Sequence, residues 1–219
     1  KNSFVIKIVD NFFDEDMLKN IQNHITTKLI FTPSYSYNDS GDPENYYGDR
    51  FFFKNDLDLL DVFSKKSEEK FKIKIKDISD GSGIDLKNLD EFRPHTDTDA
   101  AKINILIMLL GPIAVSNGTV FYTDNELDMH VGFRPNRAIL FPSDHYHSPH
   151  ASAQKGIRRY TATLFISDYE DLDELYADAI YINNYGDIPS VRKTIKLLND
   201  NPDRLHDLKP VISPIVKKE

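Results

Sequence analysis

The sequence predicts a mixed α+β protein in which helices flank a β-rich core. Between residues 89 and 167, short runs of β-branched and aromatic residues alternate with turn sequences such as Gly-Pro and Asn-Gly, a pattern typical of a sandwich or barrel. Before and after this region, apolar residues recur at helical spacing. The length of 219 residues fits one domain. We therefore expect a single domain over 1–219, with N-terminal elements in 1–88, a core at about 89–167 and a helical extension in 168–219.

The N-terminal part combines a strand and a helix with one long polar segment. Phe4–Val9 is rich in β-branched residues and predicts a strand. Asp14 is a suitable N-cap for a helix that ends near Thr27. The segment Thr32–Arg50 carries four tyrosines among prolines and glycines. We interpret it as a loop that is either a lid over a binding site or a disordered segment.

The remaining elements follow from the same patterns. Leu57–Lys70 has the apolar spacing of a helix, and Lys72–Ile78 alternates as a half-buried strand does. Two C-terminal helices are expected over Asp171–Ile182 and Ser190–Asn199. The core strands are expected at Glu91–Pro94, Lys102–Leu110, Thr119–Tyr122, Arg137–Phe141 and Arg159–Ile166.

Composition excludes several classes of protein. Because the chain has no cysteine, disulfide scaffolds, Cys-ligated zinc, iron–sulfur clusters and cysteine nucleophiles are ruled out. The 35 acidic residues outnumber the 27 basic ones, and the net charge of −8 disfavours general nucleic-acid binding. The longest apolar stretch, Ile103–Leu110, is far shorter than a membrane span of about 20 residues. We expect a soluble, cytoplasmic protein without affinity for membranes.

Histidines gather in the second half of the chain. Four of the seven lie between residues 130 and 150, and His95 precedes one of the expected strands. His95 and Asp97, at positions i and i+2, project to the same face of an extended strand and can contact one ion. The segment FPSDHYHSPH at 141–150 supplies a third ligand. Two histidines and one carboxylate on one side of a metal form the facial triad of non-haem Fe(II) oxygenases.

Several motifs occur in a characteristic order. They are His95-x-Asp97, NGTVFY at 117–122, FPS at 141–143 followed by His147, and Arg159-Tyr160-Thr161. This series resembles the Fe(II)/2-oxoglutarate-dependent oxygenases, and in particular their prolyl-4-hydroxylase-like branch. The resemblance implies a double-stranded β-helix (jelly-roll) core with flanking helices. It covers about residues 89–167, with a weaker match at the opening IVDNFFDEDML.

The resemblance implies a role for each histidine. It assigns His95, Asp97 and His147 as the metal ligands and the catalytic centre, because the family's Phe-Pro-Ser-x-x-x-His spacing ends at His147. His150, which lies nine residues before Arg159, is the second choice for the third ligand. The weaker candidates are His145 and Asp99 as ligands, and His130 is expected at the surface.

In this family a basic residue on the last core strand binds the far carboxylate of 2-oxoglutarate. Arg159 is the expected residue, since strand alternation places it on the same face as Thr161 and opposite to Arg158. A guanidinium offers a carboxylate two parallel N–H bonds. Thr161 or Asn104 could add a hydrogen bond to the cofactor, although Asn104 fits equally well as a polar residue satisfied inside the barrel.

The implied function is an Fe(II)- and 2-oxoglutarate-dependent dioxygenase. Such an enzyme hydroxylates a C–H bond with molecular oxygen, releases succinate and CO₂, and uses ascorbate as reductant. Its substrate is a prolyl or other protein side chain, or a small molecule. Two alternatives remain: a non-catalytic jelly-roll binding module, and a zinc-dependent hydrolase that uses the same His/Asp set. Arg159 favours the oxygenase, because neither alternative needs a cation that faces the metal.

Overall fold

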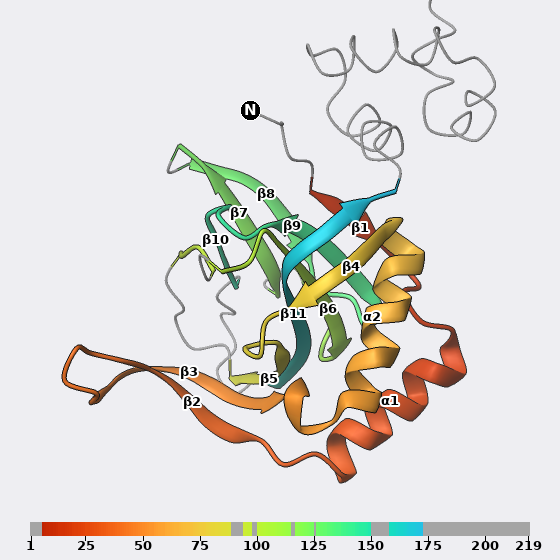
Figure 1. The fold of residues 1–219 in the computed structure, drawn as a ribbon, viewed down its shortest axis with the longest axis horizontal. Coiled ribbons are helices and arrows are strands. Elements are labelled where there is room, and N and C mark those ends of the chain that lie inside the picture. The colour runs from red at the N-terminus through yellow and green to blue at the C-terminus, as the bar shows by residue number, and fades with distance from the viewer. Residues whose placement is uncertain are drawn as a thin grey trace, which may run out of the picture.

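The computed structural model describes residues 6–88, 94–97, 100–114, 117–124, 126–149 and 158–172, and all structural statements refer to them. These residues form antiparallel strands and two α-helices (Figure 1). The elements are β1 (Lys7–Val9), α1 (Glu15–Thr27), β2 (Thr32–Tyr37), β3 (Pro43–Phe52), a 3-10 turn (Phe53–Asn55), α2 (Leu57–Phe71), β4 (Ile73–Ile78), β5 (Gly83–Asn88), β6 (Ile103–Leu110), β7 (Gly118–Thr123), β8 (Glu126–Gly132), β9 (Arg137–Pro142), β10 (His147–Pro149) and β11 (Arg158–Asp171).

The strands of the described chain form two sheets. The larger has eight strands in the order β1-β9-β6-β11-β5-β3-β2, with β4 also paired to β11. The smaller has the order β10-β7-β8. All of these pairings are antiparallel, which confirms a mixed α+β fold dominated by antiparallel sheets.

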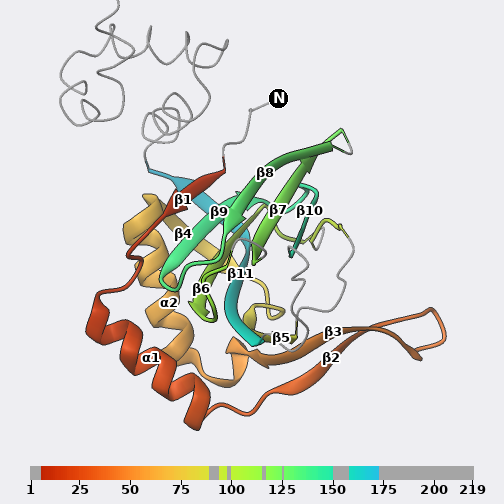
Figure 2. The ribbon, with the colours of Figure 1, turned by 180° about the vertical axis from the view of Figure 1, so that it is seen from behind.

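Both helices cover one face of the larger sheet (Figure 2). Each helix begins with an aspartate N-cap, whose carboxylate accepts a hydrogen bond from an amide of the first turn. Asp14 accepts from the amide of Met17 at 2.8 Å, and Asp56 accepts from the amide of Leu59 at 2.9 Å. The apolar core between helices and sheet includes Phe63 from α2 and alternate residues of the central strands, such as Ile105 and Leu164. The side chains between these core residues therefore point to the opposite face of the sheet, away from the helices.

A second apolar cluster joins the two sheets. Phe121 of β7 and Val131 of β8 pack against Met108 of β6 and against Ile139 and Phe141 of β9. The smaller sheet thus lies over the face of the larger sheet that the helices do not cover. Between the sheets, this arrangement leaves room for a cavity beside the apolar cluster.

The segment Thr32–Arg50, predicted to be a loop, is instead a β-hairpin: its strands β2 and β3 end the larger sheet on one side, and its tip extends away from the other strands (Figure 1). Asn38 accepts hydrogen bonds from the amides of Ser40 and Asp42 in the turn, where Gly41 has a φ of 83°. The prolines do not break the sheet, because Pro33 lies in the edge strand β2 and Pro43 begins β3.

Other expectations were confirmed or corrected in part. The helices at 14–27 and 57–70 and the strands at 72–78, 102–110, 119–122 and 137–141 were confirmed to within one or two residues. The sequence patterns missed β5, β8 and β10. Strand β11 continues to Asp171, so the chain is still extended where a helix was expected to begin. The rest of that helix, the helix at 190–199 and most of the strand at 91–94 lie outside the described residues. No helix of the described chain is long and apolar enough to cross a membrane.

Candidate metal centre and cavity

Backbone pairing brings together two segments that are about 50 residues apart. The amides of His95 and His147 each donate to the carbonyl of the other at 2.9 Å, so the two residues form an antiparallel bridge. The amide of Asp97 donates to the carbonyl of Ser143 at 3.0 Å. These bonds anchor the His95-x-Asp97 segment beside β10 and the turn that precedes it.

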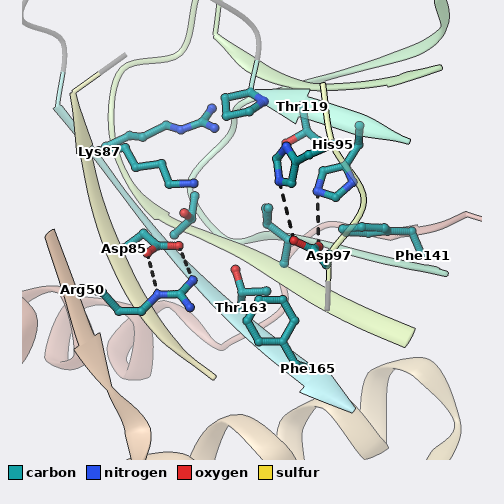
Figure 3. Close-up of a pocket in the computed structure, with 14 residues that line it drawn as sticks. Arg50, Asp85, Lys87, His95, Asp97, Thr119, Phe141, Thr163 and Phe165 are labelled. Carbon is teal, nitrogen blue, oxygen red and sulfur yellow. Dashed lines mark hydrogen bonds and ion pairs between the residues drawn. The ribbon is translucent and has the colours of Figure 1, made fainter. Parts of the chain in front are cut away.

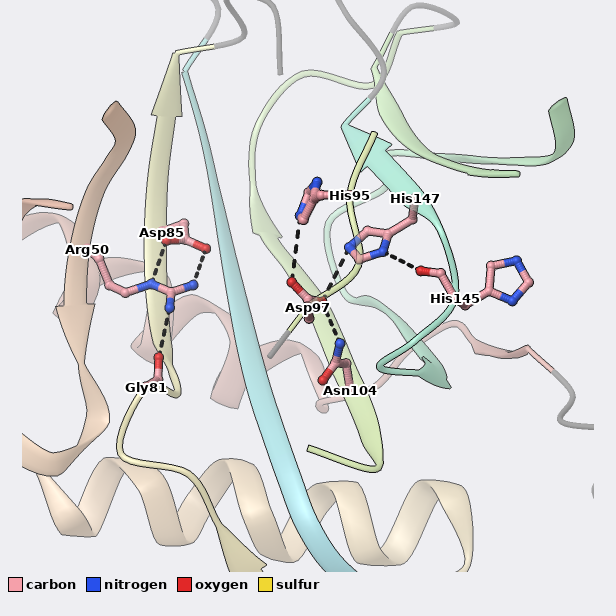
Figure 4. A network of polar contacts seen from close by, with 8 residues as sticks. All are labelled: Arg50, Gly81, Asp85, His95, Asp97, Asn104, His145 and His147. Carbon is pink, nitrogen blue, oxygen red and sulfur yellow. Dashed lines mark hydrogen bonds and ion pairs between the residues drawn. The ribbon is translucent and has the colours of Figure 1, made fainter. Parts of the chain in front are cut away.

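The three side chains converge at one point (Figure 4). Nε2 of His95 lies 3.6 Å from Oδ1 of Asp97, and Nε2 of His147 lies 3.3 Å from Oδ2 of the same carboxylate. One ligand atom from each residue lies within 4.8 Å of the others. Ligand atoms about 2 Å from one metal ion are about 3 Å apart when they occupy adjacent positions, so small side-chain movements suffice to bind an ion.

Neighbouring groups hold His147 in the state that metal binding requires. Its Nδ1 donates to the carbonyl of His145 at 2.9 Å, which leaves the Nε2 lone pair directed to the centre. Phe121 and Phe141 pack against the ring, with centroids 6.0 and 4.8 Å away. Burial lowers the pKa of His147 to about 4, although Asp97 opposes the shift, so the imidazole is neutral at neutral pH.

Asp97 is oriented by Asn104 of β6. The amide nitrogen of Asn104 donates to Oδ2 of Asp97, and the Asn104 side chain is fully buried. Asn104 is not among the described residues that line the cavity. The contact of Asn104 with Asp97 gives it a second role beside the cofactor contact that the sequence predicted, which stays a prediction.

His95, Asp97 and His147 line a cavity between the two sheets (Figure 3). On the far wall, Arg159 of β11 is only 2% exposed. Its Nη1 donates to Oδ1 of Asn117 at 3.0 Å and to the carbonyl of Gly118 at 2.7 Å. Burial lowers the pKa of Arg159 to about 10, with Asp85 opposing, so the guanidinium stays charged at neutral pH.

Two buried polar atoms in this wall have no hydrogen-bond partner within the described chain. They are Nε of Arg159 and Oγ1 of Thr119. Buried polar groups are nearly always paired in native structures, so each unpaired group requires an explanation. Each of these atoms can donate a hydrogen bond to an anionic oxygen.

Comparison with known proteins supports the fold. No family model matches the chain, and no curated protein sequence matches it. The non-haem α-ketoglutarate-dependent epimerase SnoN of nogalamycin biosynthesis is similar in structure with a TM-score of 0.51 and 11% identity, over 85% of this chain and 85% of that chain. This chain has the fold of a non-haem 2-oxoglutarate-dependent enzyme. The likeness predicted from the motifs is confirmed for the fold alone, as a similarity to this structure.

Two further structures match with lower scores. A prolyl-4-hydroxylase from Pseudomonas putida has a TM-score of 0.47 and 12% identity, over 76% of this chain and 94% of that chain. An oxidoreductase of the 2OG-Fe(II) oxygenase family from Burkholderia pseudomallei has a TM-score of 0.49 and 15% identity, over 76% of this chain and 85% of that chain.

The structure separates the candidate residues into groups. His95, Asp97, His147, Arg159 and Thr161 all line the same cavity. The ring of His145 packs against Phe121 and points away from Asp97 (Figure 4), and both His130 and Arg158 are exposed. His150 and Asp99, the rival ligands, lie outside the described residues.

Sequence reasoning missed three charged residues of the cavity, namely Arg50, Asp85 and Lys87. Asp85 accepts from Nε and Nη2 of Arg50 at 2.8 Å each, and Nη1 of Arg50 donates to the carbonyl of Gly81 at 2.7 Å. Burial opposes ionisation of Asp85, but Arg50 and Lys87 lower its pKa below the ordinary value. The alternation in GIDLKN at 83–88, which sets Asp85 and Lys87 on one face, was the signal available.

Proposed function

We propose that this chain is an Fe(II)- and 2-oxoglutarate-dependent dioxygenase that hydroxylates a C–H bond. The observation that carries the proposal is the convergence of His95, Asp97 and His147 across a cavity from the buried guanidinium of Arg159. In this proposal the two antiparallel sheets are the halves of a double-stranded β-helix. The fold shared with SnoN is consistent with it.

The residues that line the cavity fit both Fe(II) and 2-oxoglutarate. Two imidazoles and one carboxylate suit Fe(II) and leave adjacent coordination positions open. The unpartnered Nε of Arg159 and Oγ1 of Thr119 suit the far carboxylate of 2-oxoglutarate. When bound, Fe(II) and 2-oxoglutarate would supply the oxidising chemistry, in which 2-oxoglutarate becomes succinate and CO₂ and one oxygen atom enters the substrate.

The protein's own residues orient the metal ligands and the cofactor and exclude water from the centre. Asn104 fixes the Asp97 carboxylate, and the carbonyl of His145 fixes the tautomer and direction of His147. Phe121 and Phe141 exclude water from one side of the His147 ring. Arg159 would orient the cofactor through a charge-assisted hydrogen bond from Nε.

Arg159 also separates this proposal from its alternatives. A zinc-dependent hydrolase or a non-catalytic jelly-roll has no need for a buried cation that faces the metal ligands, and burying an arginine is costly unless it is paired. For the substrate we propose a prolyl or other protein side chain, with small molecules as the second class. The β2–β3 hairpin, which contributes Arg50 to the cavity, is proposed as a lid over the substrate.

The experiment that tests the function measures succinate. Purified protein with Fe(II), ascorbate, oxygen and 2-oxoglutarate should release succinate. Asp97→Ala should reduce this to the level without protein, because the metal loses the carboxylate ligand that the proposal assigns to it. Lys74→Met, at an exposed position of β4, serves as the matched control and should keep full activity.

Product analysis identifies the reaction. Mass spectrometry of a cell extract treated with wild type or Asp97→Ala should reveal a species that gains one oxygen atom only with wild type. If succinate is released but the products have the mass of the substrate, the enzyme isomerises its substrate, and the proposed hydroxylation is wrong. No succinate, together with hydrolysis that depends on zinc and not on oxygen, would overturn the proposal.

A further inference from the structure

The register of the larger sheet places two cations directly opposite each other. Lys87 of β5 and Arg159 of β11 are Cα partners in an antiparallel pair, and both line the cavity. Residues in this relation have Cβ atoms about 4.5–5.5 Å apart on the same face of a sheet, and like charges in such positions are destabilising. Figure 3 shows the Lys87 side chain directed into the cavity.

A carboxylate on the same strand as Lys87 is bound by a third cation. Asp85, two residues from Lys87 on the same strand, accepts hydrogen bonds from Arg50 on both of its oxygens. Apart from Asp97 at the metal centre, Asp85 is the carboxylate that the described lining residues contribute, against the three cations Arg50, Lys87 and Arg159. Among the described residues that line the wall opposite the metal centre, three cations therefore accompany one carboxylate.

We propose that Lys87 and Arg159 together bind the far carboxylate of 2-oxoglutarate, one from each of two paired strands. This inference rests on the proposed function and adds a residue that makes the site selective for a dicarboxylic 2-oxo acid. A carboxylate has about four lone-pair sites and can accept from the Nε of Arg159 and the ammonium of Lys87 at once. Its negative charge removes the repulsion between the two cations.

The electrostatics of Lys87 agree with this role. Burial lowers the pKa of Lys87, and the charges of Arg159 and Arg50 lower it further, whereas Asp85 raises it. A carboxylate between Lys87 and Arg159 would favour the charged lysine.

The test compares two ligands that differ only at the far end. Protein loaded with Mn(II), which supports no turnover, is titrated by calorimetry with 2-oxoglutarate and with 2-oxopentanoate, which lacks the far carboxylate. We expect Lys87→Met to weaken 2-oxoglutarate binding about 10- to 100-fold, the range for a lost hydrogen bond to a charged group. Binding of 2-oxopentanoate should change less than about twofold, and Lys87→Arg should restore most of the affinity for 2-oxoglutarate.

The Tm of each variant, with Lys74→Met as the control, shows whether Lys87 acts in ligand binding or in folding. Because Lys87→Met removes one of three neighbouring cations, the Tm of the ligand-free protein should stay the same or rise, while the increase in Tm on adding 2-oxoglutarate should shrink. Lys74→Met should match wild type in every measurement. A lower Tm, or equal losses for both ligands, would make Lys87 a structural residue and overturn the inference.

Failure of the inference differs from failure of the proposed function. If wild type binds Mn(II) and 2-oxoglutarate and Lys87→Met binds 2-oxoglutarate equally well, only the role of Lys87 is wrong, and the lysine is free to recognise the substrate. If wild type itself binds neither Mn(II) nor 2-oxoglutarate, the proposed function is wrong and the inference falls with it.

Discussion

The two faces of the larger sheet differ in what they contact and in what they do. Along β11, Ala162, Leu164 and Ile166 enter the core beneath the helices, whereas Arg159 and Thr161 line the cavity. The apolar face fixes the register of the strand, because a shift by one residue would bury the arginine under the helices. The positions of the polar side chains thus depend on packing that takes no part in the chemistry.

The largest effect is expected on the apolar face. Leu164 is fully buried in the core beneath the helices. Leu164→Ala should lower the free energy of unfolding by about 4 kcal/mol, through lost burial and the cavity that remains. Denaturant unfolding measures the loss. The Mn(II) affinity of the folded variant should stay within about twofold of wild type, and a larger drop would contradict the separation between the faces.

The Arg50–Asp85 pair on the polar face should give a smaller effect that depends on pH. Arg50 and Asp85 are 15% and 6% exposed, so Arg50→Met leaves a buried carboxylate with one cation fewer. We expect the free energy of unfolding to fall by about 3 kcal/mol at pH 7. Leu164→Ala, which removes no charge, provides the comparison.

The sign of the pH dependence follows from the pKa of Asp85. This pKa is lowered in the folded protein, because Arg50 and Lys87 outweigh the effect of burial. The pair therefore stabilises the fold fully above the ordinary value of 3.8 and loses this contribution as the pH falls through the lowered pKa. The difference between wild type and Arg50→Met should narrow below pH 3.8, whereas that for Leu164→Ala should not. A constant difference would show that the ion pair does not cause the loss.

The features that the sequence predicts correctly are those that depend on local residue patterns and on the order of motifs. Alternation placed Arg159 and Thr161 together and Arg158 on the other side, and the motif series brought His95, Asp97 and His147 to one cavity. Capping chemistry gave the start of α1 at Asp14.

The errors concern contacts between distant strands. The segment 32–50 was expected to be a loop, because its prolines are acceptable in a strand only when that strand lies at the edge of a sheet. Lys87 was missed because its place opposite Arg159 depends on the pairing of β5 with β11, which neither strand reveals alone. The role of Asn104 likewise depends on where Asp97 lies in space.

The smallest of these effects concerns Asn104, the residue of β6 that orients Asp97. Asn104→Ala should weaken Mn(II) binding about 10- to 100-fold, as is usual when a group that orients a metal ligand is removed. At saturating Mn(II), 2-oxoglutarate should bind as tightly as in wild type, because Asn104 contacts the carboxylate of Asp97 rather than the cavity. Asn23→Ala, at an exposed position of α1, is the control for loss of an asparagine side chain. Unchanged Mn(II) affinity with weaker 2-oxoglutarate binding would instead support the direct cofactor contact predicted from the sequence.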